Sequence, residues 1–442
     1  MRLTLVELSR FKVFAHASFE ITPFTVVIGP NNAGKSSLLH ALAILTQSVR
    51  IGQVAPSGRA IDLGSDVTAL THSSGTELSP QESWSVKLRW QAPVVELDTT
   101  GSDQEIGLDF SVQPQSGSSG LRTAATVAVP APPERKITVS AAYPGSQQVA
   151  IEVAGVGLAD PDVSVKRSAP LTISGPWGFQ LNVPERLDLE GVRRGEPEAI
   201  ADYACAMAAP YLSTIGEAIQ AFRYVGPDRF VDQSVLPLGA SPAENPRSAG
   251  QLIDTLVYNK DVLRRVSRRC ERVFGYGIDV ELIPNRQVSL VAFGCDDLRH
   301  NIVNLGSGLV QFIWVVLQLE LALQRQTSYG ANHVATVGID EPELHLHPAI
   351  QPDIARVLVD YIREGSQVIC TTQSEHFLMA LLQMVLEGSL SPTELSVYYV
   401  DQGHAQRLTV DEQGRLSEGL RGFFEANEEQ LRERLELLMR RG

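Results

Sequence analysis

The chain has 442 residues, which is more than one compact core normally serves, so we expect about two or three structural units. Its hydrophobic content of 43% and charged content of 20% exclude an intrinsically disordered protein. A net charge of −14 argues against a protein that coats nucleic acid through a generally basic surface, although a local groove stays open. The four cysteines lack C-x-x-C spacing and the N-terminus lacks a signal-peptide pattern, so we expect a cytoplasmic protein.

The first half of a predicted site lies near the N-terminus. Strands are predicted over 1–8, 17–21 and 24–28, and a helix over 37–45. The loop before this helix fits the G-x-x-x-x-G-K-[ST] pattern of a phosphate-binding loop, in which glycine lets backbone N–H groups surround a phosphate. Lys35 can reach the β- and γ-phosphates, and Ser36 can hold Mg²⁺. The predicted binding residues are Gly29, Pro30, Asn31, Asn32, Ala33, Gly34, Lys35, Ser36 and Ser37.

The middle of the chain changes its pattern twice. From 84 to about 183, short alternating runs separated by Pro, Gly, Ser and Asp predict an antiparallel sheet, which we interpret as a β-rich insertion. Helical patterns follow over 198–222 and 248–274, and two short runs near 278–293 predict a hairpin. The second helical segment carries a run of arginines, interpreted as a solvated face with a nucleic-acid or partner contact as the alternative. These arginines are Arg264, Arg265, Arg268, Arg269 and Arg272.

A glycine-serine-glycine segment opens a long apolar helix. Gly306, Ser307 and Gly308 offer free N–H groups that suit a phosphate, although a helix cap needs only Ser307. The apolar part of this helix, over 309–323, is interrupted by polar side chains and is predicted to be too short and too polar to cross a membrane.

Two acids follow the next strand, predicted over 333–340. Asp340, at the strand end, is placed to hold Mg²⁺, and Glu341 can orient and deprotonate an attacking water. His345 and His347 lack further ligands at a familiar spacing, so we do not predict a metal site there. Pro348 is expected to start the next helix.

Several segments together resemble the ABC-type ATPases of the SMC, RecF and OLD group, in the AAA-like branch common in bacterial defence operons. They are GPNNAGKSS, DLGSD, YVGPDR, LGSG, IDEPELHLHP, TTQSEHFL and the later SLSPTELSVYYV. The resemblance covers most of the chain and implies an α/β fold, a P-loop NTPase of ABC-ATPase type with a β-rich insertion and an α-helical segment. It divides the chain into an ATPase head formed by 1–83 and 301–442, an insertion over 84–196, and a helical segment with a hairpin over 197–300.

The resemblance also implies a mechanism with ATP and Mg²⁺, in which two heads close face to face around two nucleotides. Each site would join the phosphate loop, Asp340 and Glu341 of one subunit with Gly306–Gly308 of the other. The family usually has Thr-His-Ser at the γ-phosphate switch, whereas this chain has Gln373 in the middle of the triplet. Glutamine can donate a hydrogen bond but cannot titrate near neutral pH, so slow turnover, or ATP binding without hydrolysis, stays open.

The function implied is an ATPase that acts as a nucleotide-gated sensor or scaffold in anti-phage defence, as a homodimer or higher homo-oligomer. About seventy residues follow Gln373, too few for the Toprim nuclease domain of OLD-type relatives, so we expect a separate effector protein, a nuclease or toxin. A RecF-like DNA repair or recombination ATPase that uses the arginine face is the alternative. A transporter subunit is disfavoured, because no membrane-coupling feature is recognisable.

Overall fold

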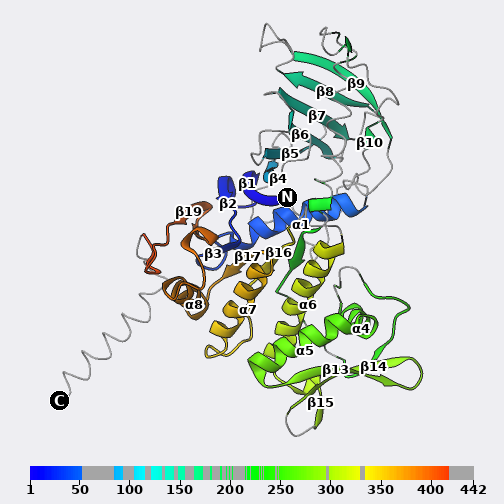
Figure 1. Cartoon of the computed structure of the whole chain (residues 1–442), viewed down its shortest axis with the longest axis vertical. Helices are drawn as coiled ribbons and strands as arrows, with labels where there is room; N and C mark the ends of the chain where they lie inside the picture. The colour runs from blue at the N-terminus through cyan, green and yellow to red at the C-terminus, as the bar shows by residue number, and fades with distance from the viewer. Residues whose placement is uncertain are drawn as a thin grey trace, which may run out of the picture.

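The computed structural model describes residues 1–51, strands between 84 and 181, isolated positions from 190 to 219, most of 221–250, and then 251–294, 298–328 and 334–417. Its centre is a six-stranded sheet in the order β11-β16-β17-β3-β18-β19 (Figure 1). Neighbouring strands from β11 to β18 are parallel, and β19 is antiparallel to β18. The strands are β3 (Phe24–Ile28), β11 (Arg223–Val225), β16 (Thr336–Asp340), β17 (Gln367–Thr372), β18 (Leu395–Asp401) and β19 (His404–Leu408). This parallel core confirms the predicted α/β fold.

The register of the central strands aligns their carboxyl ends. Asp340 pairs with Thr371 between β16 and β17, and Thr372 pairs with Ile28 between β17 and β3. All three strands are buried at every position, as is typical of parallel strands covered on both faces. The end of β3, where the phosphate-loop pattern begins, therefore lies beside the acids that follow β16.

Helices cover both faces of the central sheet. Alternate strand residues divide between two cores: Val27 and Ile369 pack with α1, whereas Val26 and Cys370 pack with the helices of the opposite face. The helices are α1 (Lys35–Ile51) on one face and α6 (Ser307–Ser328), α7 (Gln351–Arg363) and α8 (Glu375–Leu386) on the other. The expected start of α7 at Pro348 is wrong, because 348–350 form a turn and the helix begins at Gln351.

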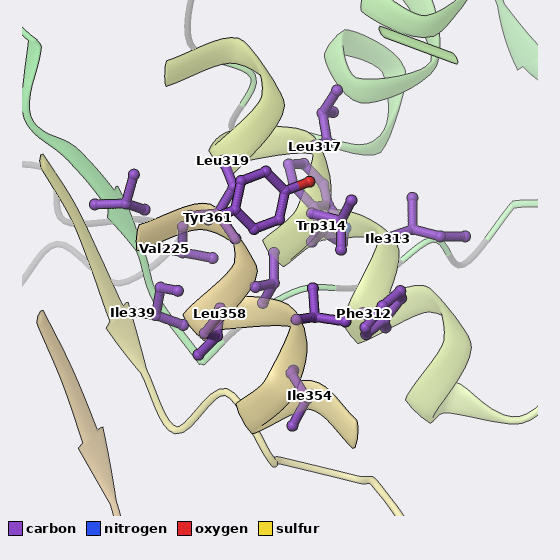
Figure 2. Packing of buried hydrophobic residues seen from close by; sticks show 14 of the residues in the cluster. Val225, Phe312, Ile313, Trp314, Leu317, Leu319, Ile339, Ile354, Leu358 and Tyr361 are labelled. Carbon is purple, nitrogen blue, oxygen red and sulfur yellow. The ribbon is translucent and has the colours of Figure 1, made fainter. Parts of the chain in front are cut away.

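Helix α6 corrects the expectation that this apolar segment is too short to cross a membrane. The window Ser307–Gln326 is long and apolar enough by length and composition, but 83% of it is buried inside the protein. Figure 2 shows why: Phe312 and Leu319 of α6 pack with Leu358 and Tyr361 of α7 and with Ile339 of β16. Burial against α7 and the sheet thus accounts for the apolar composition of this helix.

The β-rich segment does not form a sheet of its own. Its strands extend the antiparallel pair at the N-terminus of the chain and form a second sheet with that pair. A nine-stranded sheet has the order β10-β9-β8-β7-β6-β5-β4-β1-β2, with antiparallel neighbours throughout. Trp84 and Trp90 of β4 are buried in the same core as Phe11 of β1. The strands are β1 (Arg2–Phe11), β2 (Phe14–Glu20), β4 (Trp84–Ala92), β5 (Gln104–Pro114), β6 (Leu121–Ala131), β7 (Arg135–Tyr143), β8 (Gln148–Ala154), β9 (Ser164–Thr172) and β10 (Gln180–Leu181). The division of the chain at residue 84 stays a prediction.

A smaller unit packs beside α6. The predicted hairpin is confirmed, and so is the helical character predicted over 248–274. This segment forms two helices that meet at Asn259, whose side chain accepts from Val262 N at 3.2 Å. The elements are β12 (Leu236–Pro237), α4 (Ala249–Tyr258), α5 (Lys260–Phe274), β13 (Gly277–Ile283), β14 (Gln287–Phe293) and β15 (Arg299–Asn301), and the 3₁₀ turns are η1 (Ile302–Asn304) and η2 (Pro392–Glu394). The DLGSD segment and residues 418–442 lie outside the described residues.

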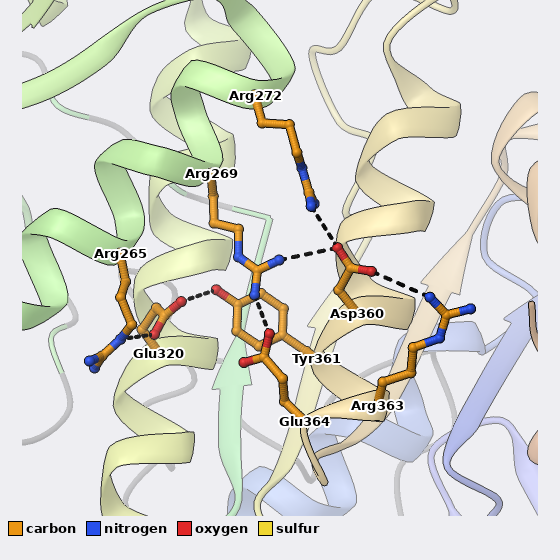
Figure 3. Close-up of polar contacts among 8 residues, drawn as sticks. All are labelled: Arg265, Arg269, Arg272, Glu320, Asp360, Tyr361, Arg363 and Glu364. Carbon is orange, nitrogen blue, oxygen red and sulfur yellow. Dashed lines mark hydrogen bonds and ion pairs between the residues drawn. The ribbon is translucent and has the colours of Figure 1, made fainter.

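Most arginines of α5 pair with acids inside the head (Figure 3). Arg269 reaches Asp360 at 3.1 Å and also Glu364, and its guanidinium lies 4.7 Å from the centre of the Tyr361 ring. The other pairs join Arg264 to Asp261, Arg265 to Glu320 and Arg272 to Asp360. The solvated-face interpretation is therefore wrong for Arg269, and the positive charge of α5 is largely neutralised by α6 and α7.

Replacing Arg269 by Ala is expected to lower the free energy of unfolding by about 1.5–3 kcal/mol, because it removes a shielded cation from two acids and a ring. Its side chain is 17% exposed, whereas that of Arg264 is 70% exposed. The matched variant Arg264→Ala should change stability by about 0.5 kcal/mol or less. Urea unfolding followed by circular dichroism measures both, and equal effects would show that these ion pairs do not hold α5 on α7.

Candidate nucleotide-binding site

The loop between β3 and α1 has a backbone that only glycine satisfies at two positions. Gly29 has a φ of 151° and Gly34 a φ of 107°. A Cβ on Gly29 would lie 2.1 Å from the carbonyl oxygen of Val400, and one on Gly34 would lie 2.2 Å from Cγ2 of Val13. The loop is thus closely packed against β18 and the β1–β2 turn, which fixes the direction of its N–H groups.

Lys35 is buried at the start of α1. Its ammonium donates to the carbonyl oxygens of Gly29 at 3.1 Å and Pro30 at 2.9 Å. Burial lowers the pKa of Lys35, while the carboxylates of Glu341 and Asp340 oppose that shift. The cation is therefore held inside the loop, where a phosphate group would meet it.

The carboxylate of Asp340 connects three elements. Ser36 Oγ donates to Asp340 Oδ1 at 2.8 Å, the Thr371 hydroxyl donates to the same oxygen, and Tyr224 OH lies 3.4 Å from Oδ2. A serine hydroxyl beside a carboxylate offers the oxygen ligands that Mg²⁺ takes next to a nucleotide. These residues therefore fit the predicted metal site.

Two residues that sequence reasoning missed lie behind Asp340. His40 Nε2 is 3.2 Å from Tyr224 OH, and His40 Nδ1 contacts the ammonium of Lys12. Burial and, to a smaller extent, the ammonium of Lys12 lower the pKa of His40 to about 4. Burial also lowers the pKa of Lys12 to about 8. No sequence signal pointed to this pair, because β1, α1 and β11 meet only in the folded chain.

Glu341 and Gln373 meet at the adjacent strand ends. The Gln373 amide donates to the carboxylate of Glu341, so the residue that replaces the usual histidine contacts the predicted general base directly. The backbone N–H of Glu341 donates to the carbonyl oxygen of Thr371 at 3.1 Å. The structure thus brings Lys35, Ser36, Asp340, Glu341 and Gln373 together at one edge of the sheet.

Glu343, within the IDEPELHLHP segment, is a third acid at this edge, and no role was predicted for it. Its Oε1 accepts from the Thr372 hydroxyl at 2.6 Å and from the backbone N–H of Gln373 at 3.1 Å. Its Oε2 is buried, and it has no hydrogen-bond partner among the described residues. Burial raises the pKa of Glu343, and the hydrogen bond from Thr372 opposes the rise. The carboxylate therefore ties the acidic turn after β16 to the switch triplet after β17.

The predicted signature lies apart from these residues. Gly306 and Ser307 are exposed, and no hydrogen bond among the described residues joins them to the phosphate loop. A Cβ on Gly308 would lie 2.9 Å from the carbonyl oxygen of His345 and 2.9 Å from Leu346 Cδ2, so this glycine packs against the acidic turn. The start of α6 is thus fixed to its own head while Ser307 faces solvent.

Two family descriptions match the chain. Residues 1–79 match "AAA ATPase domain", and residues 297–380 match "AAA domain, putative AbiEii toxin, Type IV TA system". Among curated proteins, none matches significantly. The two segments contain the phosphate loop and the acidic strand end, respectively.

The solved structures to which the chain is similar include heads of SMC proteins. The "SMC head domain from Thermotoga maritima" is 13% identical, with a TM-score of 0.37 over 93% of this chain and 100% of that one. An "SmcHead bound to the C-winged helix domain of ScpA" is 13% identical, with a TM-score of 0.45 over 92% of this chain and 98% of that one. A head with an extended coiled coil, bound to the C-terminal domain of ScpA derived from Pyrococcus furiosus, is 11% identical, with a TM-score of 0.37 over 92% and 95%.

Replacing Glu343 by Gln is expected to change how stability depends on pH. Because the pKa of Glu343 is raised in the folded state, the unfolded chain releases this proton first as pH rises above the ordinary value of 4.5. As pH rises from 4.5, the free energy of unfolding of the wild type should therefore fall relative to that of Glu343→Gln. The expected slope is about 1.4 kcal/mol per pH unit, until pH reaches the pKa of the folded state. Urea unfolding at a series of pH values measures the difference. Glu387→Gln, which removes an exposed carboxylate, is the control, and a difference that is flat with pH would contradict the expectation.

Proposed function

We propose, from the premise that this chain carries an ABC/AAA-type ATPase head of the SMC-like group, that it binds and hydrolyses ATP as a switch between open and closed head pairs. The observation that carries the proposal is the meeting of Ser36, Asp340 and Glu341 beside the phosphate loop. These three groups come from segments about 300 residues apart and supply the hydroxyl, the carboxylate and the base that phosphoryl transfer to water needs.

Each residue has a definite part in this reaction. The loop N–H groups and the Lys35 ammonium would bind the β- and γ-phosphates, and Ser36 and Asp340 would hold Mg²⁺, which would neutralise phosphate charge. Glu341 accepts the proton of the attacking water. The side-chain amide of Gln373 orients the carboxylate of Glu341. Unlike a histidine, this amide cannot take up a proton, which is consistent with slow turnover.

The exposed signature supports a two-headed site. Gly306 and Ser307 face solvent, and among the residues that the structure describes no hydrogen bond joins them to their own phosphate loop. Their N–H groups are therefore accessible to the nucleotide of a second head. ATP then acts as the link between two copies, and hydrolysis releases them. A homodimer is the smallest assembly that completes both sites.

A nucleotide-gated sensor or scaffold in anti-phage defence, acting in the cytoplasm with a separate nuclease or toxin as effector, is the biological role that we propose. The family description matched by residues 297–380 names a toxin of a toxin–antitoxin system, which supports a place in defence. The RecF-like alternative has less support, because the α5 arginines that would contact DNA pair largely with acids of the head.

Light scattering of Glu341→Gln with and without Mg-ATP tests the switch. The substitution keeps the shape of the side chain but removes the base, so turnover should fall by about 10²–10⁴-fold while ATP binding persists. We expect the mass to double with Mg-ATP and to stay that of a monomer without it.

Two variants serve as controls for this experiment. Lys35→Ala should not bind ATP and should stay monomeric, whereas Ser307→Arg should bind ATP and still stay monomeric, because the added side chain blocks the surface used in trans. A Glu341→Gln protein that binds ATP as a monomer would overturn the two-headed site. Absence of ATP turnover in the wild type would overturn the assignment as an ATPase.

A further inference from the structure

Glu341 has a backbone conformation that its place in the sequence disfavours. Its φ is +48°, in the left-handed region that residues with a Cβ rarely adopt. Pro342 follows it, and a residue before proline is normally driven into an extended conformation. Contacts from neighbouring elements must therefore hold Glu341 in place.

Arg229 supplies those contacts on the carbonyl side. One terminal nitrogen of its guanidinium donates to the carbonyl oxygen of Asp340 and, at 3.2 Å, to that of Glu341. These carbonyls belong to the two peptide groups that flank the Glu341 Cα. The Nε of Arg229 donates to the carbonyl oxygen of Gly226 at 2.5 Å, which fixes the guanidinium to its own loop after β11.

Thr371 completes the hold on the amide side. Its carbonyl oxygen and its hydroxyl accept from the backbone N–H of Glu341 at 3.1 and 3.2 Å. Since β11 and β17 both pair in parallel with β16, Arg229 and Thr371 approach the same peptide segment from the two neighbouring strands. Glu341 is therefore held between two strands at the edge where the nucleotide would bind.

The surroundings of Arg229 indicate a role toward the main chain. The residue is 2% exposed, and none of the salt bridges among the described residues involves it. Burial lowers its pKa to about 10, opposed by Asp340 and Glu343, so the group keeps its charge near neutral pH. A buried cation is costly, and a planar fork of donors suits several carbonyl oxygens as a lysine does not.

We propose that Arg229 is a positioning residue for ATP hydrolysis, which holds Glu341 in the left-handed conformation that directs its carboxylate toward Gln373 and the phosphate loop. Arg229 acts through Glu341 and does not touch the nucleotide. The inference rests on the proposed function in one respect, namely that Glu341 is the general base.

Kinetics of Arg229→Gln test this role. A base displaced by about 1 Å costs about 10²-fold in rate, so we expect kcat to fall by about that factor while KM for ATP stays within about threefold. In a Glu341→Gln background the same substitution should lower the residual kcat by less than about twofold, because the two residues act as one unit. Full additivity in this cycle would overturn the proposal.

Arg223→Gln is the matched control. Arg223 is a buried arginine on β11, the strand before the loop that carries Arg229, but its guanidinium donates to Gln318 of α6 at 3.0 Å. We expect it to lower the unfolding temperature without a selective loss of kcat. An equal loss of kcat in both variants would mean that Arg229 has a merely structural role.

Two further measurements test the role independently. The first applies where Arg229→Gln folds poorly, and the second applies also where ATP is not hydrolysed. Arg229→Lys keeps the charge without the fork, so it should remain impaired, and full rescue of kcat would overturn the proposal. Amide hydrogen exchange of the ligand-free protein should show lost protection across 340–346 in both Arg229 variants and not in Arg223→Gln. Unchanged exchange would overturn the proposal, whereas absent turnover in the wild type would overturn only the proposed function.

Discussion

The buried carboxylate of Asp340 is the group on which the arrangement of the site depends. It accepts hydrogen bonds from Ser36 at the start of α1 and from Thr371 of β17, and Tyr224 of β11 lies beside it. A buried carboxylate without partners is costly, so the elements that carry these donors must keep their positions relative to β16. The parallel register of β16, β17 and β3 satisfies this requirement, because it brings the strand ends to one edge.

The acids after Asp340 divide the remaining work. Glu341 carries the carboxylate that we propose as the general base, and its unfavourable backbone is held by Arg229 and Thr371. Glu343 turns the other way and binds Thr372 and the backbone of Gln373. The acidic turn and the switch triplet are therefore joined twice, once through each acid. In the mechanism that we propose, this double connection couples the two strand ends without a titrating histidine.

Charges buried away from the site hold the larger parts together. Glu320 of the otherwise apolar α6 accepts from Arg265 of α5 and from Tyr361 of α7, so a polar residue in an apolar helix becomes a three-way link. Arg269 makes a second link between α5 and α7 (Figure 3). On the opposite face of the head, β4 continues the sheet of β1 into the β-rich segment, which attaches that segment through backbone pairing and two buried tryptophans.

Local sequence patterns by themselves determined several elements of this protein. The loop pattern, the strand before it and the hairpin over 277–293 followed from short-range spacing, because glycine dihedrals and alternating side chains act over a few residues. The roles of Tyr224, Arg229 and His40 did not follow from the sequence, because each depends on a contact with a residue more than 100 positions away. The same limit explains why the arginines of α5 were interpreted as a solvated face, because a charge run by itself does not show which acids lie beside it. Only the tertiary structure determined which of these arginines are shielded from solvent, because a charged side chain is buried only where another element places an acid beside it.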